Sequence, residues 1–389
     1  MINCIQSRCF TLVCVLGLNL PLTDVALAQN TNETSPTNGL NRLNPEISAT
    51  ADLLLLFVPE SHAHEEHGDE GTEEGHEEHA GEHDAGHAHG AAVGEGDHGF
   101  RFVPREVEID IRANVDPFSS FRTTLGIDPH GIHLEEAWYE WVGLLPGFNI
   151  RVGRFRQNIG PINQRHLHAW DQMELPFIMK GLLGPAGLAQ TGVGLHLLFG
   201  GFGDSAHTLT VEVTNSENEA LYGDEAWRLP ATLAHFATHI PFADSGYLEL
   251  GLGAQHGYHH TEPNRFTNLY SADLTVAYDP PGSTDRFRMF LRGQWLAKHV
   301  QQEDDSLELE HGAYAYLDFR FNRQWQAGVR GDWLQKEDTF GVTPYVSFWQ
   351  SEFFRLRLQY RATIEHESLN HLVALQVTGA IGPHRHEDY

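Results

Sequence analysis

Apolar and polar residues alternate along most of this chain, in segments of about ten residues that begin near Phe102. Repeated many times, this pattern indicates membrane-barrel strands, in which one face meets lipid and the other a polar lumen. The clearest segments are residues 106–113, 209–213, 248–255, 286–292, 355–364 and 373–381. Beyond the N-terminal segment the longest apolar run, Leu53–Val58, has six residues, whereas a transmembrane helix needs roughly 18 or more. If the chain spans a membrane, a closed barrel is the structure that satisfies its backbone hydrogen bonds in lipid.

The connections between these segments alternate as well. Short ones rich in Gly, Pro, Asp and Ser occupy residues 114–120, 144–148, 200–206, 242–246, 279–285, 321–324 and 350–352. The others, mostly longer, occupy residues 59–99, 128–132, 158–190, 215–229, 257–265, 297–306, 335–341 and 365–370. Outer-membrane barrels have short periplasmic turns and long outer loops. We therefore predict an all-β fold, a transmembrane antiparallel β-barrel of about 16 strands over residues 47–389, with a water-filled lumen.

A soluble β-sandwich, or a pair of them, is the alternative, because alternation alone also fits a sheet with one solvated face. The aromatic residues favour the barrel, since many lie near predicted strand ends, as in interfacial girdles. They are Trp138, Tyr139, Trp141, Tyr247, Tyr278, Trp295, Trp325, Trp333, Tyr345, Phe348 and Trp349.

The N-terminus has the pattern of a secretory signal peptide over residues 1–28. An apolar run from Phe10 to Leu18 follows Arg8, and Ala26-Leu27-Ala28 precedes Gln29. All three cysteines lie within this segment, so the mature chain would carry neither disulfides nor thiolate metal sites. Residues 29–46 read as a flexible mature N-terminus. We expect export to the outer membrane of a bacterial cell.

Residues 98–160 resemble the phosphate-selective porin O and P superfamily. The resemblance rests on the runs HGFRFVPREVEIDIRANVDPFSSFRTTLGI and IHLEEAWYEWVGLLPGFNIRVGRFRQNIG. They combine an Arg-bearing amphipathic strand, a hairpin, a strand of the EEAY type, a proline turn and a strand that closes on Gly-Arg-Phe-Arg before a long loop. The resemblance implies a sixteen-stranded channel, often a homotrimer, for anions. The chain departs from the family in having few inward Lys residues and acidic early strands.

A histidine- and glutamate-rich tract interrupts the alternation over residues 59–99. The part from Glu60 to Asp97 holds thirteen carboxylates and no Lys or Arg, and cannot bury enough apolar surface to fold alone. Imidazole and carboxylate groups bind divalent transition metals, so we predict a disordered loop that binds Zn²⁺ or a related ion. The alternative is that the loop is only a solvated acidic spacer. The predicted ligands are His62, His64, His67, His76, His79, His83, His87, His89 and His98. The spacing defines no closed site, and the loop would be extracellular if residues 47–58 form a strand and periplasmic if they do not.

The alternation also assigns charges to the lumen. Strands early in the chain present carboxylates inward, and late strands present arginines, which would create a transverse field across the pore. The predicted pore-lining residues are Glu106, Glu108, Asp110, Glu136, Glu140, Arg286, Arg288, Arg292, Arg330, Arg355, Arg357 and Arg361. The alternative is that these residues are only the polar lining that every such barrel needs.

The connection over residues 158–190 is the predicted constriction loop, because it is too apolar to be left in water. Folding into the lumen would bury its apolar side chains and bring its polar ones toward the pore axis. These are Arg165, His166, His168, Asp171, Glu174 and Lys180.

The formal net charge of −28 argues against a nucleic-acid partner. No nucleophile elbow, phosphate-binding glycine loop or HExxH pair is present, so we expect no enzyme and no required cofactor. The sequence predicts a passive outer-membrane channel for small solutes or ions, whose His-rich loop serves zinc uptake or buffering. The competing prediction is a surface metal-binding protein for which a non-conducting barrel is only an anchor. The region before Ile47 is too short for the plug domain of an energy-coupled receptor.

Overall fold

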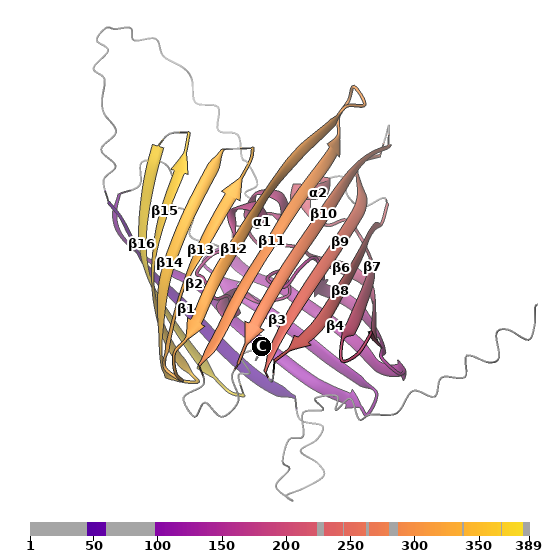
Figure 1. The fold of residues 1–389 in the computed structure, drawn as a ribbon, viewed down its shortest axis with the longest axis horizontal. Helices are drawn as coiled ribbons and strands as arrows, with labels where there is room; N and C mark the ends of the chain where they lie inside the picture. The colour runs from indigo at the N-terminus through magenta and orange to yellow at the C-terminus, as the bar shows by residue number, and fades with distance from the viewer. Residues whose placement is uncertain are drawn as a thin grey trace, which may run out of the picture. The chain divides into compact units, whose positions relative to one another are not determined.

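Sixteen antiparallel strands form one closed barrel, in which each strand pairs with the next and β1 pairs with β16 (Figure 1). The computed structural model describes residues 45–59, 98–223, 229–243, 245–261, 264–279, 287–336, 338–366 and 368–383. The strands are β1 (Glu46–Val58), β2 (Gly99–Asp116), β3 (Ser119–Asp128), β4 (Gly131–Leu145), β5 (Phe148–Arg156), β6 (Ala189–Gly200), β7 (Ala206–Thr214), β8 (Ala231–Phe242), β9 (Gly246–Thr261), β10 (Asn264–Tyr278), β11 (Arg288–Gln301), β12 (Leu307–Arg320), β13 (Trp325–Leu334), β14 (Thr339–Ser351), β15 (Phe354–Glu365) and β16 (Ser368–Ile381). The predicted fold class and strand number are confirmed.

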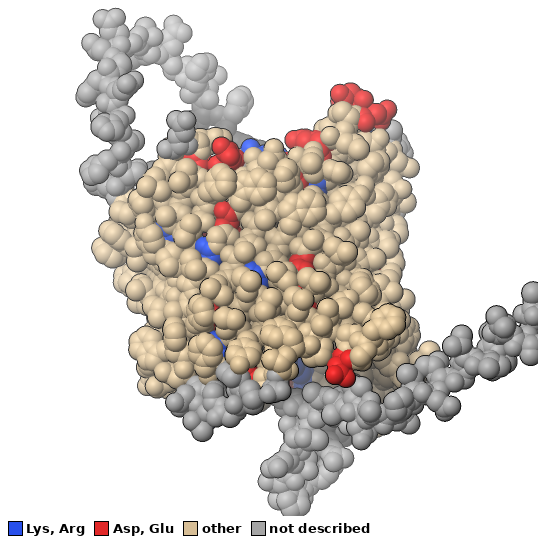
Figure 2. Space-filling model, viewed as in Figure 1, with Lys and Arg blue, Asp and Glu red and all other residues tan. Residues whose placement is uncertain are grey.

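The outer wall is apolar. Side chains such as Leu195, Leu250 and Val329 are exposed on it, and each alternates with inward-facing neighbours. The face seen in Figure 2 consists mainly of uncharged residues, and acidic side chains gather at the tip of the β11–β12 hairpin, where Glu303, Asp304 and Asp305 are exposed. An apolar band with charged ends is the surface that a bilayer requires of a barrel.

A buried carboxylate stabilises the closure of the barrel. Asp52 of β1 accepts hydrogen bonds from Gln376 (2.7 Å) and Thr378 (3.0 Å) of β16. From the other side, Arg105 of β2 lies 3.3 Å from the same carboxylate. The first and last strands are therefore joined by side chains as well as by their backbone pairing.

Several hairpins at the loop end are longer than the sequence pattern suggests. β9 continues to Thr261 and β10 begins at Asn264, although we predicted a loop over residues 257–265. β11 continues to Gln301, although we predicted a loop over residues 297–306. These residues are polar, but backbone pairing tolerates polar side chains once the strands leave the apolar band, so composition alone places the strand ends too early.

In the part of the chain that the structure describes, the connections contain three short helices: η2 (Leu167–Ala169), α1 (Phe177–Leu183) and α2 (Glu219–Tyr222). In Figure 1, α1 and α2 lie within the ring of strands, and α1 contacts β11, β12 and β13. Among the described residues, none of the helices has the length and apolar character needed to cross a membrane.

Apolar residues also line parts of the inner face, which explains two departures from simple alternation. Leu54 and Leu56 of β1 point inward and form a buried cluster with Met173, while Leu53 is exposed on the outside, so this end of β1 is apolar on both faces. Tyr345, predicted for the aromatic girdle, is instead buried in the lumen and donates a hydrogen bond to Asp318.

The predicted signal peptide (residues 1–28), the predicted N-terminal segment up to residue 44 and the acidic tract (residues 60–97) lie outside the described residues.

Candidate functional site

The connection between β5 and β6, residues 157–188, lies inside the barrel, and we call it the inner loop. Its apolar side chains form a buried core with α2 and with inward residues of β8 and β10 to β13. Ile178, Met179 and Leu182 of α1 are at most 1% exposed. Hydrophobic burial therefore holds this loop in the lumen, and the apolar composition that suggested an inward fold supplies the driving force.

Charged contacts join the inner loop to the arginine-bearing wall. Asp171 lies 3.6 Å from Arg292 of β11 and accepts a 2.9 Å hydrogen bond from Tyr316 of β12. Glu174 pairs with Arg361 of β15, and its backbone carbonyl accepts a 2.8 Å bond from Arg330 of β13. The carboxylates of the loop therefore face the basic wall.

Electrostatics in this region favour the ionised carboxylates. Burial alone would raise the pKa of Asp171, but Arg165 and Arg292 outweigh that effect and lower it. The same balance lowers the pKa of Glu174, with Arg361 and Arg330 as the neighbouring cations. Both carboxylates thus stay charged where they meet the wall.

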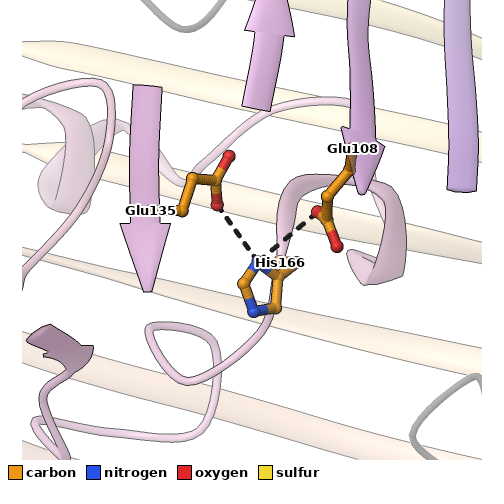
Figure 3. Close-up of side chains that lie close together, drawn as sticks. All are labelled: Glu108, Glu135 and His166. Carbon is orange, nitrogen blue, oxygen red and sulfur yellow. Dashed lines mark hydrogen bonds and ion pairs between the residues drawn. The ribbon is translucent and has the colours of Figure 1, made fainter. Parts of the chain in front are cut away.

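The opposite, acidic wall receives the two histidines of the inner loop. His166 Nδ1 lies 3.1 Å from Glu135 Oε2 of β4 and 3.4 Å from Glu108 Oε2 of β2. Figure 3 shows both carboxylates directed at this one nitrogen. On the far side of the ring, Nε2 lies 2.7 Å from Glu136 Oε2, and His168 Nδ1 lies 3.0 Å from Glu108 Oε2.

His166 is protonated in this setting. Burial would lower its pKa, but the charge of Glu108 and the hydrogen bonds to Glu135 and Glu136 outweigh burial and raise the pKa to about 10. The inner loop is therefore bipolar, with cationic His166 at the acidic wall and anionic Asp171 and Glu174 at the basic wall. Both walls also hold buried groups of the opposite sign, such as Arg122 of β3 and Asp332 of β13.

Two β-bulges place consecutive charged residues in the lumen. In the pairing of β1 with β2, Asp52 opposes Glu106 and Leu53 opposes Pro104, so Arg105 is left out of the ladder. In the pairing of β3 with β4, Thr124 opposes Glu136 and Leu125 opposes Leu134, so Glu135 is left out. The extra residue of a bulge turns toward the same side as its neighbour. Arg105 and Glu135 are consequently buried inside rather than exposed to lipid.

A chamber of about 480 Å³ lies toward the short-turn end of the barrel. Its lining includes Gly147 of the β4–β5 turn and Pro161, Gln164 and Arg165 of the inner loop. The ionisable groups around it are of both signs: Arg151, Arg165, His196, His235, Glu249 and Asp273. The chamber is therefore polar, bordered by the inner loop, and lacks the uniform positive charge of an anion filter.

The remaining predicted site residues fall into several settings. Glu106, Glu108, Asp110 and Glu136 are buried on the acidic wall, as are Arg292, Arg330, Arg355 and Arg357 on the basic wall. Arg355 donates a hydrogen bond to the backbone carbonyl of His168 in the inner loop. Arg357 instead donates hydrogen bonds to Ser347 and Gln376 of the wall. Asp110 accepts hydrogen bonds from Arg112 and Arg122. Glu140 pairs with Arg151, and Arg288 with Asp279, both away from the inner loop.

Two of the predicted residues that the structure describes, Lys180 and His98, do not join this site. Lys180 is on the inner loop but exposed, and His98 is exposed just before β2. Arg286 and the histidines from His62 to His89 lie outside the described residues.

Sequence reasoning missed several charged lumen residues, among them Arg105, Arg122, Glu135, Arg156 and Glu212. Arg156 pairs with Glu135 at 2.9 Å, and Glu212 accepts a bond from the backbone of Asn158. The sequence does contain a signal for the bulged positions, which is a pair of consecutive charged residues within a strand. Regular alternation would turn one of the two toward lipid, where a charge is unfavourable.

No family model matches the chain. An uncharacterized protein of Aquifex aeolicus (strain VF5) is 26% identical over 302 residues, which cover 65% of this chain and 61% of that protein. The match therefore spans less than two thirds of the relative.

Solved outer-membrane proteins share the fold. The outer membrane channel DcaP of Acinetobacter baumannii superposes with a TM-score of 0.56 at 8% identity, covering 88% of this chain and 98% of that one. An anion-selective porin from Comamonas acidovorans gives 0.55 at 9% identity, covering 87% and 99%. The trimer form of OmpT from Vibrio cholerae gives 0.52 at 8% identity, covering 87% and 99%. At these identities the likeness establishes a porin-like barrel and nothing finer.

Proposed function

We propose that this protein is a passive channel of the bacterial outer membrane for small solutes or ions, exported by its N-terminal signal peptide. The observation that carries the proposal is a charged lumen inside an apolar wall, crossed by the inner loop and widening to a 480 Å³ chamber. Porin-like barrels that solved structures describe as channels have the same fold. Because a trimer form is among them, we propose a homotrimer as the assembly.

The inner loop makes the passage narrow. Its contacts reach β2 and β4 on one side and β11 to β15 on the other, and we therefore propose that the passage admits only small solutes or ions. The lining argues against phosphate selectivity, because four buried carboxylates, Glu106, Glu108, Glu135 and Glu136, occupy one wall. We propose weak charge selectivity in place of the anion preference that the family resemblance implies.

The proposal includes metal binding by the His-rich segment, residues 60–98. Its support is composition alone: imidazoles interleaved with carboxylates, without Lys or Arg up to residue 97. Such a segment at the mouth of a channel would raise the local concentration of Zn²⁺ or buffer it.

A non-conducting barrel that anchors a metal-binding segment is the second candidate. The buried apolar core of the inner loop favours it, because a well-packed core inside a lumen excludes water. The two candidates make opposite predictions for ion current.

Single-channel recording of the refolded mature protein in a planar bilayer separates them. We expect small ohmic steps that micromolar Zn²⁺ alters, and steps that Zn²⁺ no longer alters in a variant without residues 60–97. A folded barrel that passes no current would refute the channel and leave the anchor. Current that Zn²⁺ changes equally with and without the segment would refute its role in the channel.

A further inference from the structure

We propose that the acidic wall of the lumen binds one divalent transition-metal ion between Glu108, Glu135 and His166, with Glu106 as an additional oxygen ligand. This site is distinct from the His-rich segment. It belongs to the described barrel, and it does not depend on whether the barrel conducts.

The three ligand atoms lie within 4.8 Å of one another, and two of their distances are close to those in a coordination shell. Nδ1 of His166 lies 3.1 Å from Glu135 Oε2 and 3.4 Å from Glu108 Oε2. A tetrahedral Zn²⁺ ion with bonds of about 2.0–2.1 Å holds its ligand atoms about 3.3–3.4 Å apart. The three atoms come from β2, β4 and the inner loop (Figure 3). An ion would enter with small shifts of the side chains, and would replace the proton that the imidazole now shares with the two carboxylates.

The outer contacts orient His166 as a ligand. Its Nε2 lies 2.7 Å from Glu136 Oε2, which keeps a proton on Nε2 and leaves Nδ1 for the metal. Glu136 is itself fixed, since its Oε1 accepts a 3.0 Å hydrogen bond from the backbone N–H of Arg156. A carboxylate, a histidine and a metal in series are the usual second-shell arrangement of protein metal sites.

A further buried carboxyl group, that of Glu106, lies beside these ligands and shares a hydrogen bond with Glu135. Glu106 is 6% exposed. It lies over Gly126 of β3: a Cβ at that glycine would be 2.8 Å from Glu106 Oε1 and 2.9 Å from Glu135 Oε1. The missing side chain of Gly126 thus lets carboxylates from two non-adjacent strands approach each other. A cation bound next to Glu135 would take the place of the proton that these two buried carboxyl groups share.

The local charge also favours a cation. Four buried carboxyl groups lie on this wall, those of Glu106, Glu108, Glu135 and Glu136. Among the described residues, two guanidinium groups contact these four carboxyl groups directly, Arg156 at 2.9 Å from Glu135 and Arg122 at 3.5 Å from Glu136. The imidazoles of His166 and His168 are their other close partners. Arg156 can keep its bond to Glu135 as an outer contact after a metal binds. The bulge in β4 brings Glu135 inward beside Glu136, and so adds a carboxylate at this point of the wall.

The mixed ligand set selects the class of metal. One imidazole nitrogen with two or three carboxylate oxygens suits Zn²⁺ or a neighbouring transition metal better than Mg²⁺, which prefers oxygen and water. Because the ligands belong to both the wall and the inner loop, the ion would fix the loop in place.

The test is crystallography of the full-length mature protein grown with ZnCl₂, with diffraction recorded at the zinc absorption edge. We expect an anomalous peak bounded by His166 Nδ1, Glu108 and Glu135, retained in excess Mg²⁺. Glu108→Gln and Glu135→Gln should each remove this peak. Glu212→Gln is the matched control, because Glu212 is also a buried lumen carboxylate that contacts the inner loop, through Asn158 and Gln157.

Zinc titration calorimetry in detergent gives a readout that does not need crystals. Wild type and Glu212→Gln should bind one more Zn²⁺ per chain than Glu135→Gln, on top of whatever the His-rich segment binds. Equal stoichiometry in all three, or zinc-edge peaks confined to other parts of the chain, would overturn the proposal. Neither result bears on whether the barrel passes current in the absence of Zn²⁺, so the channel proposal and the metal-site proposal fail separately.

Discussion

Arg330 of β13 donates a 2.8 Å hydrogen bond to the backbone carbonyl of Glu174, so a guanidinium of the wall holds the inner loop directly. The same guanidinium lies 2.7 Å from Asp332, and neither side chain has any exposed surface. A charge buried this deeply needs all its partners, because water cannot replace a lost one. The contact between loop and wall is therefore also part of the stability of the barrel interior.

Replacing Arg330 with Met should destabilise the protein by about 3–5 kcal/mol, because it leaves the carboxylate of Asp332 buried without its cation. Guanidinium-induced unfolding in lipid vesicles, followed by tryptophan fluorescence, measures the change. Arg265→Met is the control: its partner Glu303 is 88% exposed, and exposed pairs contribute at most about 1 kcal/mol. Equal losses in the two variants would contradict this account.

Acid should loosen the inner loop at Asp171. Burial raises the pKa of this carboxyl, but Arg165 and Arg292 outweigh it, so the pKa in the folded protein is below the ordinary value of 3.8. Such a group stabilises the fold above pH 3.8, and its contribution is lost as the pH falls through the lower folded value. We therefore expect the free energy of unfolding to fall as the pH drops below about 4.

Asp171→Asn isolates this contribution to the pH dependence. The variant should be less stable than wild type at pH 7, and its stability should change less between pH 5 and pH 2. Asp305→Asn, in the exposed β11–β12 hairpin, should keep the wild-type profile. An acid profile identical in wild type and Asp171→Asn would assign the effect to other groups.

The sequence alone was sufficient to predict the barrel, because alternation is a local property that lipid and lumen impose on every strand. It also predicted an inward inner loop from the apolar residues around Ile178. It did not predict which wall residues the loop meets. Arg355 and His168 are 187 positions apart, and their contact depends on the closure and register of the whole barrel.

The bulge in β4 explains why Glu135, one ligand of the proposed metal site, was missed. Strict alternation in β4 turns Glu136 inward and assigns Glu135 to the lipid, yet the structure buries both. A carboxylate facing lipid is unfavourable, so the doublet Glu135-Glu136 is itself a sign of an extra residue in the strand. The neighbouring Arg105-Glu106 doublet of β2 carries the same sign.

Gly126→Ala should lower zinc affinity at the proposed metal site about tenfold or more, as changes around metal ligands do. The new Cβ would lie 2.8 Å and 2.9 Å from the carboxylate oxygens of Glu106 and Glu135 and would push them apart. Stability should change little, because those atoms are the ends of flexible side chains. Gly331→Ala, whose Cβ would meet nothing within 4 Å, is the control for titration calorimetry, and equal affinities would argue against a role for Gly126.

Ile178→Ala should loosen the packing of the inner loop without opening the barrel wall. Ile178 is fully buried in α1, and removing such a side chain costs about 2–5 kcal/mol through lost burial and a cavity. Because α1 is not part of the wall, the strands should stay paired while the loop becomes more mobile. Single-channel recordings should then show larger or more frequent openings than wild type.

Lys180→Ala changes an exposed residue of the same helix and should leave the current unchanged. Limited proteolysis supplies the second measurement, since a loosened loop in Ile178→Ala should be cleaved within residues 157–188. Cleavage without any change in current would mean that ions do not pass beside α1. That outcome would favour the non-conducting barrel if wild type is silent, and a path on the acidic side of the lumen if wild type conducts.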